Sequence, residues 1–237
     1  MNIRDLHGFN LLALGPDSVD LVTFQVQSKG NLSDHLRALA SQAAVTLRST
    51  LAVRGQPVSL SIKSDVVATI DIPAIPLTTT YDVVGGKLVP TFQNGSNATR
   101  LRLVWTPPTG MRVVLVMAMT KSETGWSIVR DRHYLLAVDT TKTVPGWFRL
   151  PLPNTYADAQ ICMGTYCYEH PTIAAAVSAG VAQFLDSPWN SDLMGDRGNT
   201  HALFSFDAKT NNAAPPDQAW TGICSRVNNV LFERIVL

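Results

Sequence analysis

The stretch LRLVWTPPTGMRVVLVMAMTKSETGWSIVRDRHYLLAV, residues 101–138, contains three apolar segments with turn-forming residues between them. The three segments are Leu101–Trp105, Val113–Met119 and Tyr134–Val138. Pro107–Gly110 and Ser122–Gly125 favour turns, because proline and glycine adopt the backbone angles that turns require. A fourth strand is expected at Trp147–Leu150. The pattern therefore predicts a four-stranded antiparallel meander.

Regular patterning stops after this meander and returns as a helix. Residues between Pro151 and His170 show no helical or strand period, so an irregular segment is expected there. Pro171 fits the first position of a helix, where its missing N–H has no cost. Ser187-Pro188 ends that helix, since the residue before proline avoids the helical region. The expected buried face of this helix comprises Ile173, Val177, Val181, Phe184 and Leu185.

The chain before the meander predicts a smaller set of helix and strands. Apolar residues at three- and four-residue spacing favour a helix over Ser33–Arg48. Strands are expected at Leu21–Val26, Val58–Ile62 and Val66–Ile72. The prolines of Ile72–Pro76 should then interrupt the strand pattern. We therefore expect an α+β protein, with an N-terminal α/β extension over residues 1–85 and a core over residues 86–237.

Composition excludes two classes of protein and indicates a cellular compartment. The formal net charge is +1 and the basic residues are scattered, so a nucleic-acid-binding surface is not expected. No apolar run reaches the ~18 to 20 residues that cross a bilayer, and Met1–Phe9 does not resemble a secretory signal. The three cysteines are an odd number, which favours reduced thiols in a cytoplasm.

The irregular segment contains the motif on which the functional hypothesis depends. Residues 150–164 read LPLPNTYADAQICMG, in which Pro153-Asn154 precedes Ile161-Cys162 and the cysteine follows the asparagine by eight residues. This spacing resembles that of ubiquitin-conjugating enzymes, where a His-Pro-Asn tripeptide follows the meander and the catalytic cysteine comes eight residues after its asparagine. Leu152 stands in the place of that histidine. The resemblance implies the ubiquitin-conjugating fold for the core.

The resemblance is strongest to the bacterial branch of this superfamily, in particular to protein B of the PRTRC plasmid systems (prokaryotic ubiquitin-conjugating-like family D). That family has a Val/Ile-Cys-x-Gly element and a Phe-x-x-Ser element, which are matched here by Ile161–Gly164 and Phe184–Ser187. The resemblance covers roughly residues 101–193 and only loosely the first hundred.

The resemblance implies an acyltransferase that uses a thioester. Cys162 would accept a ubiquitin-like protein from an activating enzyme and pass it to an amine of a protein or other target, or to a thiol. Asn154 would donate a hydrogen bond to the oxyanion, since such donors stabilise acyl-transfer transition states. Asp192, with Asn190 and Ser191, would orient the incoming lysine. Neither a metal nor an organic cofactor is expected.

Other interpretations of the same residues stay open. Cys162 could be a buried apolar residue, which is a common role for a single cysteine. Cys162, Cys167 and His170 could bind zinc, with His201 or Cys224 as the fourth ligand. A cysteine hydrolase would use Cys162 as the nucleophile and His170, His201 or His133 as the base. The fold could also serve as a non-catalytic scaffold in a plasmid- or phage-linked system.

Overall fold

The fold is dominated by antiparallel strands, and it was obtained as a computed structural model. The structure describes residues 45–62, 66–92, 101–144, 146–164, 169–186 and 201–228, together with residues 189, 193 and 232. Its main sheet has seven strands in the order β1-β2-β3-β8-β9-β10-β12. These strands are β1 Val45–Val53, β2 Gln56–Ile62, β3 Val66–Asp71, β8 Met111–Lys121, β9 Trp126–Asp139, β10 Trp147–Arg149 and β12 Ser225–Arg226.

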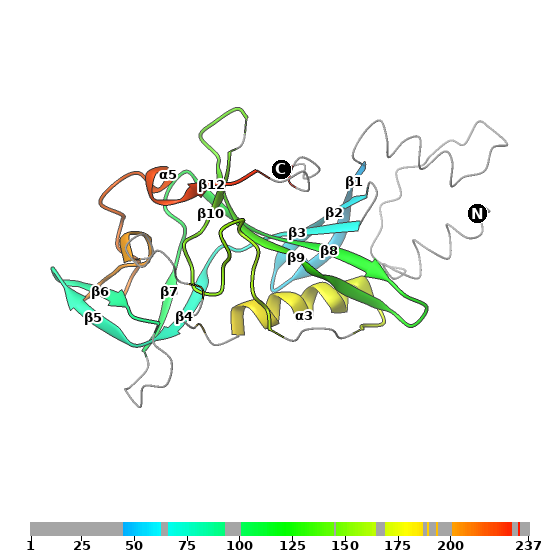
Figure 1. Cartoon of the computed structure of the whole chain (residues 1–237), viewed down its shortest axis with the longest axis horizontal. Coiled ribbons are helices and arrows are strands. Elements are labelled where there is room, and N and C mark those ends of the chain that lie inside the picture. Colours follow the sequence, from blue (N-terminus) through cyan, green and yellow to red (C-terminus); the bar gives the residue numbers. More distant parts are fainter. Residues whose placement is uncertain are drawn as a thin grey trace.

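Two smaller sheets lie at one end of the main sheet (Figure 1). The first pairs β4, Ile75–Thr79, with β7, Leu101–Trp105. The second has the order β11-β6-β5, formed by Phe206–Asp207, Lys87–Pro90 and Tyr81–Val84. The turn between β5 and β6 contains Gly85 and Gly86, both at positive φ, as glycine readily allows.

The central strands β8 and β9 are buried on both faces of the main sheet. Successive side chains of a strand point to opposite faces, so alternate residues enter different cores. Leu115 and Met117 of β8 belong to one core cluster, whereas Val114 and Val116 belong to the other. Covering both faces explains why β8 reads as a continuous apolar run rather than as an alternating pattern.

One face of the main sheet is covered by α3, Ile173–Asp186 (Figure 1). Its buried residues are Ile173, Ala176, Val177, Gly180, Val181 and Phe184. Gly180 permits close packing, because a Cβ there would lie 2.4 Å from Ile128 Cδ1 and 2.7 Å from Met117 Sδ. The helix lies where the sequence predicts, but it begins at Ile173 rather than at Pro171, and Leu185 is only partly buried. Ser187 and Pro188 lie outside the described residues.

The opposite face is covered by irregular segments and the end of the chain. Its core cluster contains Ala159 from the segment after β10, together with Val227 and Phe232. Phe232 meets the ring of Tyr134 edge-on, with the two centroids 5.3 Å apart. Packing of the segment after β10 onto the sheet fixes the position of the residues around Cys162.

The predicted N-terminal helix is wrong where it can be compared with the structure. Val45–Arg48, the last four residues of that prediction, belong to strand β1. Pairing with β2 outweighs the local helical spacing in this segment, as tertiary context often does. The rest of the predicted helix, and the predicted strand Leu21–Val26, lie outside the described residues.

The predicted meander is correct in three strands and wrong in the first. Strands β8, β9 and β10 are consecutive antiparallel neighbours, and each contains most or all of a predicted strand. Strand β9 begins at Trp126, well before the predicted start at Tyr134. Leu101–Trp105 forms β7, but it pairs with β4 rather than with β8. The neighbour of β8 on that side is β3, so β8 lies between two antiparallel strands.

The expected break at Ile72–Pro76 is shorter than predicted. Strand β4 begins at Ile75 and includes Pro76, which a two-stranded sheet tolerates because each strand has an open edge. Strands β1 to β3 lie before residue 85, and they share the main sheet with β8 to β10. The sheet thus joins residues on both sides of the expected division at residues 85 and 86.

Within the described residues, no helix has both the length and the apolar character needed to cross a membrane.

Candidate functional site: the Cys162 hairpin

Cys162 lies at one end of a short hairpin formed by residues 154–162. Thr155 and Ile161 form an antiparallel bridge, which places Asn154 opposite Cys162. The Cys162 N–H donates a hydrogen bond of 2.7 Å to the Asn154 carbonyl oxygen. The eight-residue spacing in the sequence is therefore the distance along the chain between two facing ends of this hairpin.

A tight turn closes the other end of the hairpin. The Tyr156 N–H donates to the Gln160 carbonyl at 2.8 Å, and the Ala159 N–H donates to the Tyr156 carbonyl at 3.0 Å. The Asp158 carboxylate accepts from the Gln160 N–H at 3.0 Å, which is the local bond that makes aspartate a turn former. Asn154 and Ala159 have positive φ, 62° and 71°, so the hairpin has two left-handed positions.

The hairpin is attached to the sheet through backbone and core contacts. The Ile161 N–H donates to the His133 carbonyl at 3.0 Å, and the Leu135 N–H donates to the Ala159 carbonyl at 3.1 Å. Ala159 and Thr155 are fully buried. The hairpin thus continues along the same edge of β9 that pairs with β10. The backbone of Cys162 is therefore held in place, although its side chain is exposed.

A large bulge in β9 lies beside the hairpin. Met117 pairs with His133 and Met119 pairs with Ile128, so Ala118 alone lies opposite residues 129–132. Asp131 within the bulge has a φ of 60°, which is an uncommon conformation for a residue with a side chain. Bulges redirect side chains and occur often near functional sites.

A small pocket of about 120 Å³ lies between the bulge and the hairpin. Cys162, Tyr156 and Gly164 line it from the hairpin side, and His133 lines it from β9. Its other lining residues are Ile128, Arg130, Asp131, Ile161 and Met163. The pocket thus places a cysteine, a tyrosine and a histidine around one space.

Tyr156 is the polar side chain in contact with Cys162. The two residues lie diagonally across the hairpin, where side chains of one face can meet. The hydrogen bond between the phenol and the Cys162 side chain raises the pKa of Tyr156, and the charges of Asp131 and Asp158 act in the same direction. Tyr156 therefore stays protonated and can donate to the sulfur.

His133 is buried in the wall of the same pocket, with 7% of its surface exposed. Burial lowers the pKa of His133, although backbone groups of Ile161 and Val129 and the charge of Asp131 oppose this effect. Its Nδ1 atom has no hydrogen-bond partner within the described part of the chain. A neutral imidazole can accept a proton at the ring nitrogen that carries no hydrogen.

The structure brings together two of the three predicted site residues. Cys162 is exposed, which rules out the interpretation of a buried apolar cysteine, and Asn154 lies opposite it. Asp192 lies outside the described residues, as do Asn190 and Ser191. Leu152, in the place of the family's histidine, is 1% exposed and belongs to the main core.

The predicted zinc ligands do not form a cluster in the described residues. No group of three histidine, cysteine or acidic side chains lies close enough there to hold a metal ion. Cys167 is outside the described residues, so the full zinc set is not described. Cys224 is buried beside α5, Trp220–Ile223, and belongs to the main core cluster.

Burial of Cys224 should make it far less reactive toward alkylating reagents than the exposed Cys162. Burial raises the pKa of Cys224 to about 12, so its thiolate fraction at pH 8 is on the order of 10⁻⁴. We expect iodoacetamide to alkylate Cys162 in the native protein at pH 8 and to leave Cys224 unmodified. Peptide mass spectrometry measures both sites, and alkylation in denaturant is the control in which both react. Equal native labelling of the two would contradict the structure.

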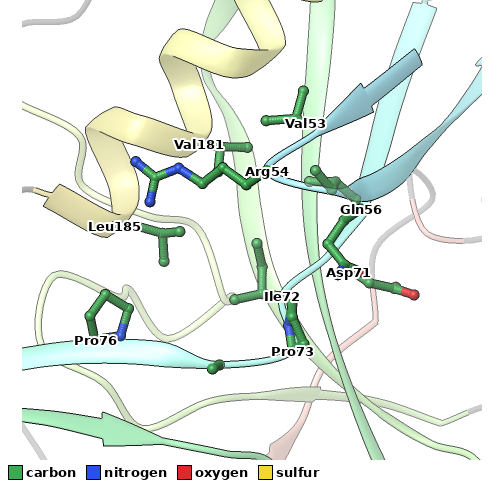
Figure 2. Close-up of a pocket in the computed structure, with 11 residues that line it drawn as sticks. Val53, Arg54, Gln56, Asp71, Ile72, Pro73, Pro76, Val181 and Leu185 are labelled. Carbon is green, nitrogen blue, oxygen red and sulfur yellow. The ribbon is translucent and has the colours of Figure 1, made fainter.

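A second pocket of about 180 Å³ lies between the β1–β2 turn, the start of β4 and the last turn of α3 (Figure 2). Arg54 reaches across to α3, where it forms an ion pair of 2.8 Å with the exposed carboxylate of Asp186. Besides Arg54, the residues that line this second pocket are Val53, Gln56, Ile70, Asp71, Ile72, Pro73, Ala74, Pro76, Val181 and Leu185. The described lining of this pocket contains neither cysteine nor histidine, whereas Cys162 and His133 both line the first pocket.

No model of a known protein family, no curated protein and no solved structure matches the chain.

Two residues of the pocket were missed or left undecided by the sequence. Tyr156 was not singled out, although its place two residues after Asn154 puts it diagonally opposite Cys162 once the hairpin forms. His133 was one of three candidate bases, and His170 and His201 do not line the pocket. The bulge that brings residues 130 and 131 to the pocket has no signal in the sequence.

Proposed function

We propose that Cys162 accepts a ubiquitin-like protein as a thioester and transfers it to an amine, as ubiquitin-conjugating enzymes do. The observation that carries this proposal is an exposed Cys162 held opposite Asn154 at the end of an anchored hairpin. Two large partners can reach a thiol in such a position. The activating enzyme would supply the acyl group, and the target would supply the amine.

The charging step exchanges one thioester for another. The Cys162 sulfur bonds to the carbonyl carbon of the donor thioester, and the bond from that carbon to the donor sulfur breaks. The donor sulfur takes up the proton that Cys162 gave up, so the step is balanced. The side-chain amide of Asn154 is proposed to donate to the oxyanion that forms between these events. Such thiol chemistry requires reduced cysteine, which fits a cytoplasmic protein.

The surrounding elements support this proposal in their order. Strands β8, β9 and β10 form an antiparallel series, the irregular segment with Cys162 follows, and α3 comes next. The ubiquitin-conjugating family has the same succession of meander, active-site segment and helix. Here the series continues into β3, β2 and β1, so the sheet is wider than the predicted four-stranded meander.

A cysteine hydrolase is the second candidate, and one observation favours it. His133 shares the pocket with Cys162, and burial keeps its imidazole neutral, as a general base requires. In that reaction, water would replace the amine as the group that receives the acyl chain.

The fate of the acyl group distinguishes the two candidates. The activating enzyme of the same genome first charges Cys162 with the ubiquitin-like protein, and ATP is then removed. Loss of the thioester is followed with and without free lysine. We expect loss that depends on the lysine concentration and yields an amide product. Equally fast loss without amine would support the hydrolase. Full biological activity of the Cys162→Ala variant would support a non-catalytic scaffold and contradict both enzymes.

A further inference from the structure

We propose that His133 is the proton acceptor for the Cys162 thiol, acting across the pocket that both residues line. This inference rests on the proposed function, because it assigns how the nucleophile of that reaction is activated. In ubiquitin-conjugating enzymes, the only histidine of the motif lies where this chain has Leu152. The motif therefore supplies no counterpart of His133.

The burial of His133 is the first observation. The side chain lies in the central strand β9 with 7% of its surface exposed, and its Nδ1 atom is without a partner in the described part of the chain. A buried polar atom without a partner costs free energy, so an uncompensated one is often functional. His133 also lines the pocket that Cys162 lines.

The bulge in β9 lies next to His133 and to the pocket. The hairpin pairs with β9 at residues 133–135, and His170 pairs with it at Trp126, which leaves residues 127–132 between these two contacts. The bulge of residues 129–132 lies in that gap. The pocket thus lies beside the part of β9 between these two contacts.

The proton can cross the pocket through water. A volume of about 120 Å³ has room for at least one water molecule, which takes up ~30 Å³ in the liquid. General bases act either in direct contact or through one water. As the Cys162 sulfur attacks the acyl carbon, its proton passes through this water to His133, and the imidazolium returns the proton to the departing thiol.

The charged groups around the pocket set how His133 titrates. Arg130 and Asp131 face it from the bulge, and Tyr156 and Cys162 face it from the hairpin. Asp131 favours the imidazolium, whereas burial opposes it more strongly, so the pKa of His133 stays below its ordinary value of 6.5. His133 is therefore neutral, and able to accept a proton, at pH 7.

The test is the pH profile of Cys162 alkylation by iodoacetamide, followed at the Cys162 peptide between pH 5 and 9. As the pH is raised, we expect the wild-type alkylation rate to increase first below pH 6.5, where His133 becomes neutral. The rate should then level near neutrality and increase again as free thiolate forms. His133→Asn should lose the lower rise and keep the upper one. His170→Asn is the matched control, because the Trp126–His170 pairing uses backbone atoms, and it should keep both rises.

A His133→Asn profile identical to that of the wild type would overturn the proposal, provided that thermal unfolding shows the variant to be folded. His133→Gln serves as the second variant. A wild-type profile that shows only the upper rise would also overturn the proposal, and that result needs no variant. The alkylation needs no acyl donor, so its failure is separate from failure of thioester formation. In the charging reaction, His133→Asn should slow thioester formation by ~10²-fold or more.

Discussion

Replacing Asn154 with glycine is expected to slow acyl transfer at Cys162 by ~10² to 10³-fold, the usual effect of removing an oxyanion donor. Asn154 has a φ of 62°, which glycine adopts without strain, so the backbone bond from the Cys162 N–H to residue 154 should survive. The rate is measured in single-turnover charging and discharge assays with a defined amount of thioester donor.

Comparison with the Asn154→Ala variant separates the effect of losing the amide donor from the effect of straining the backbone at residue 154. Alanine at positive φ costs roughly 1–2 kcal/mol, so this variant should lose both the amide and some hairpin order. Alkylation of Cys162 by iodoacetamide builds no oxyanion and should change little in Asn154→Gly. Wild-type transfer rates in Asn154→Gly would show that the side chain of Asn154 has no part in the reaction.

Replacing Trp105 with alanine is expected to lower the free energy of unfolding by ~3–5 kcal/mol, as for other buried aromatic residues. Trp105 is 1% exposed at the end of β7, and its ring centroid lies 4.5 Å from that of Phe204. Its Nε1–H donates to the Leu203 carbonyl at 3.1 Å. The side chain therefore joins β7 to the segment before β11. Urea unfolding followed by circular dichroism measures the change.

Val104→Ala is the matched control for this prediction. Val104 precedes Trp105 in the same strand but is 51% exposed, so its truncation should cost less than ~1 kcal/mol. Trp105→Phe keeps a ring in the core and loses the hydrogen bond, and it should fall between the two. A loss below ~1 kcal/mol for Trp105→Ala would contradict the packing of this strand.

The sequence predicted strands well where a local pattern decides them. The apolar run of β8 and the turn residues on either side of it require no knowledge of the partner strands. The partner of β7 could not be predicted in the same way, because pairing with β4 or with β8 satisfies the same apolar alternation. Val45–Arg48 shows the converse, since a helical spacing was overruled by pairing with β2.

The sequence predicted the spacing of Asn154 and Cys162, but it did not predict the hairpin that this spacing forms. The eight-residue spacing of Asn154 and Cys162 is a local property, and the structure places these two residues opposite each other. The pocket also needs the bulge of β9, which comes from a shift in register between β8 and β9. Register depends on the whole sheet, so the placement of His133 and Cys162 around one pocket could not be predicted from the sequence.

Cys162 carries an acyl group in the proposed reaction. The direct measurement is the intact mass of the protein after incubation with the activating enzyme, ATP and the ubiquitin-like protein of the same genome. We expect an increase equal to one ubiquitin-like protein minus one water, which reductant removes and which Cys162→Ala lacks. An unchanged mass for folded wild-type protein, while the activating enzyme itself is charged, would contradict the proposed function.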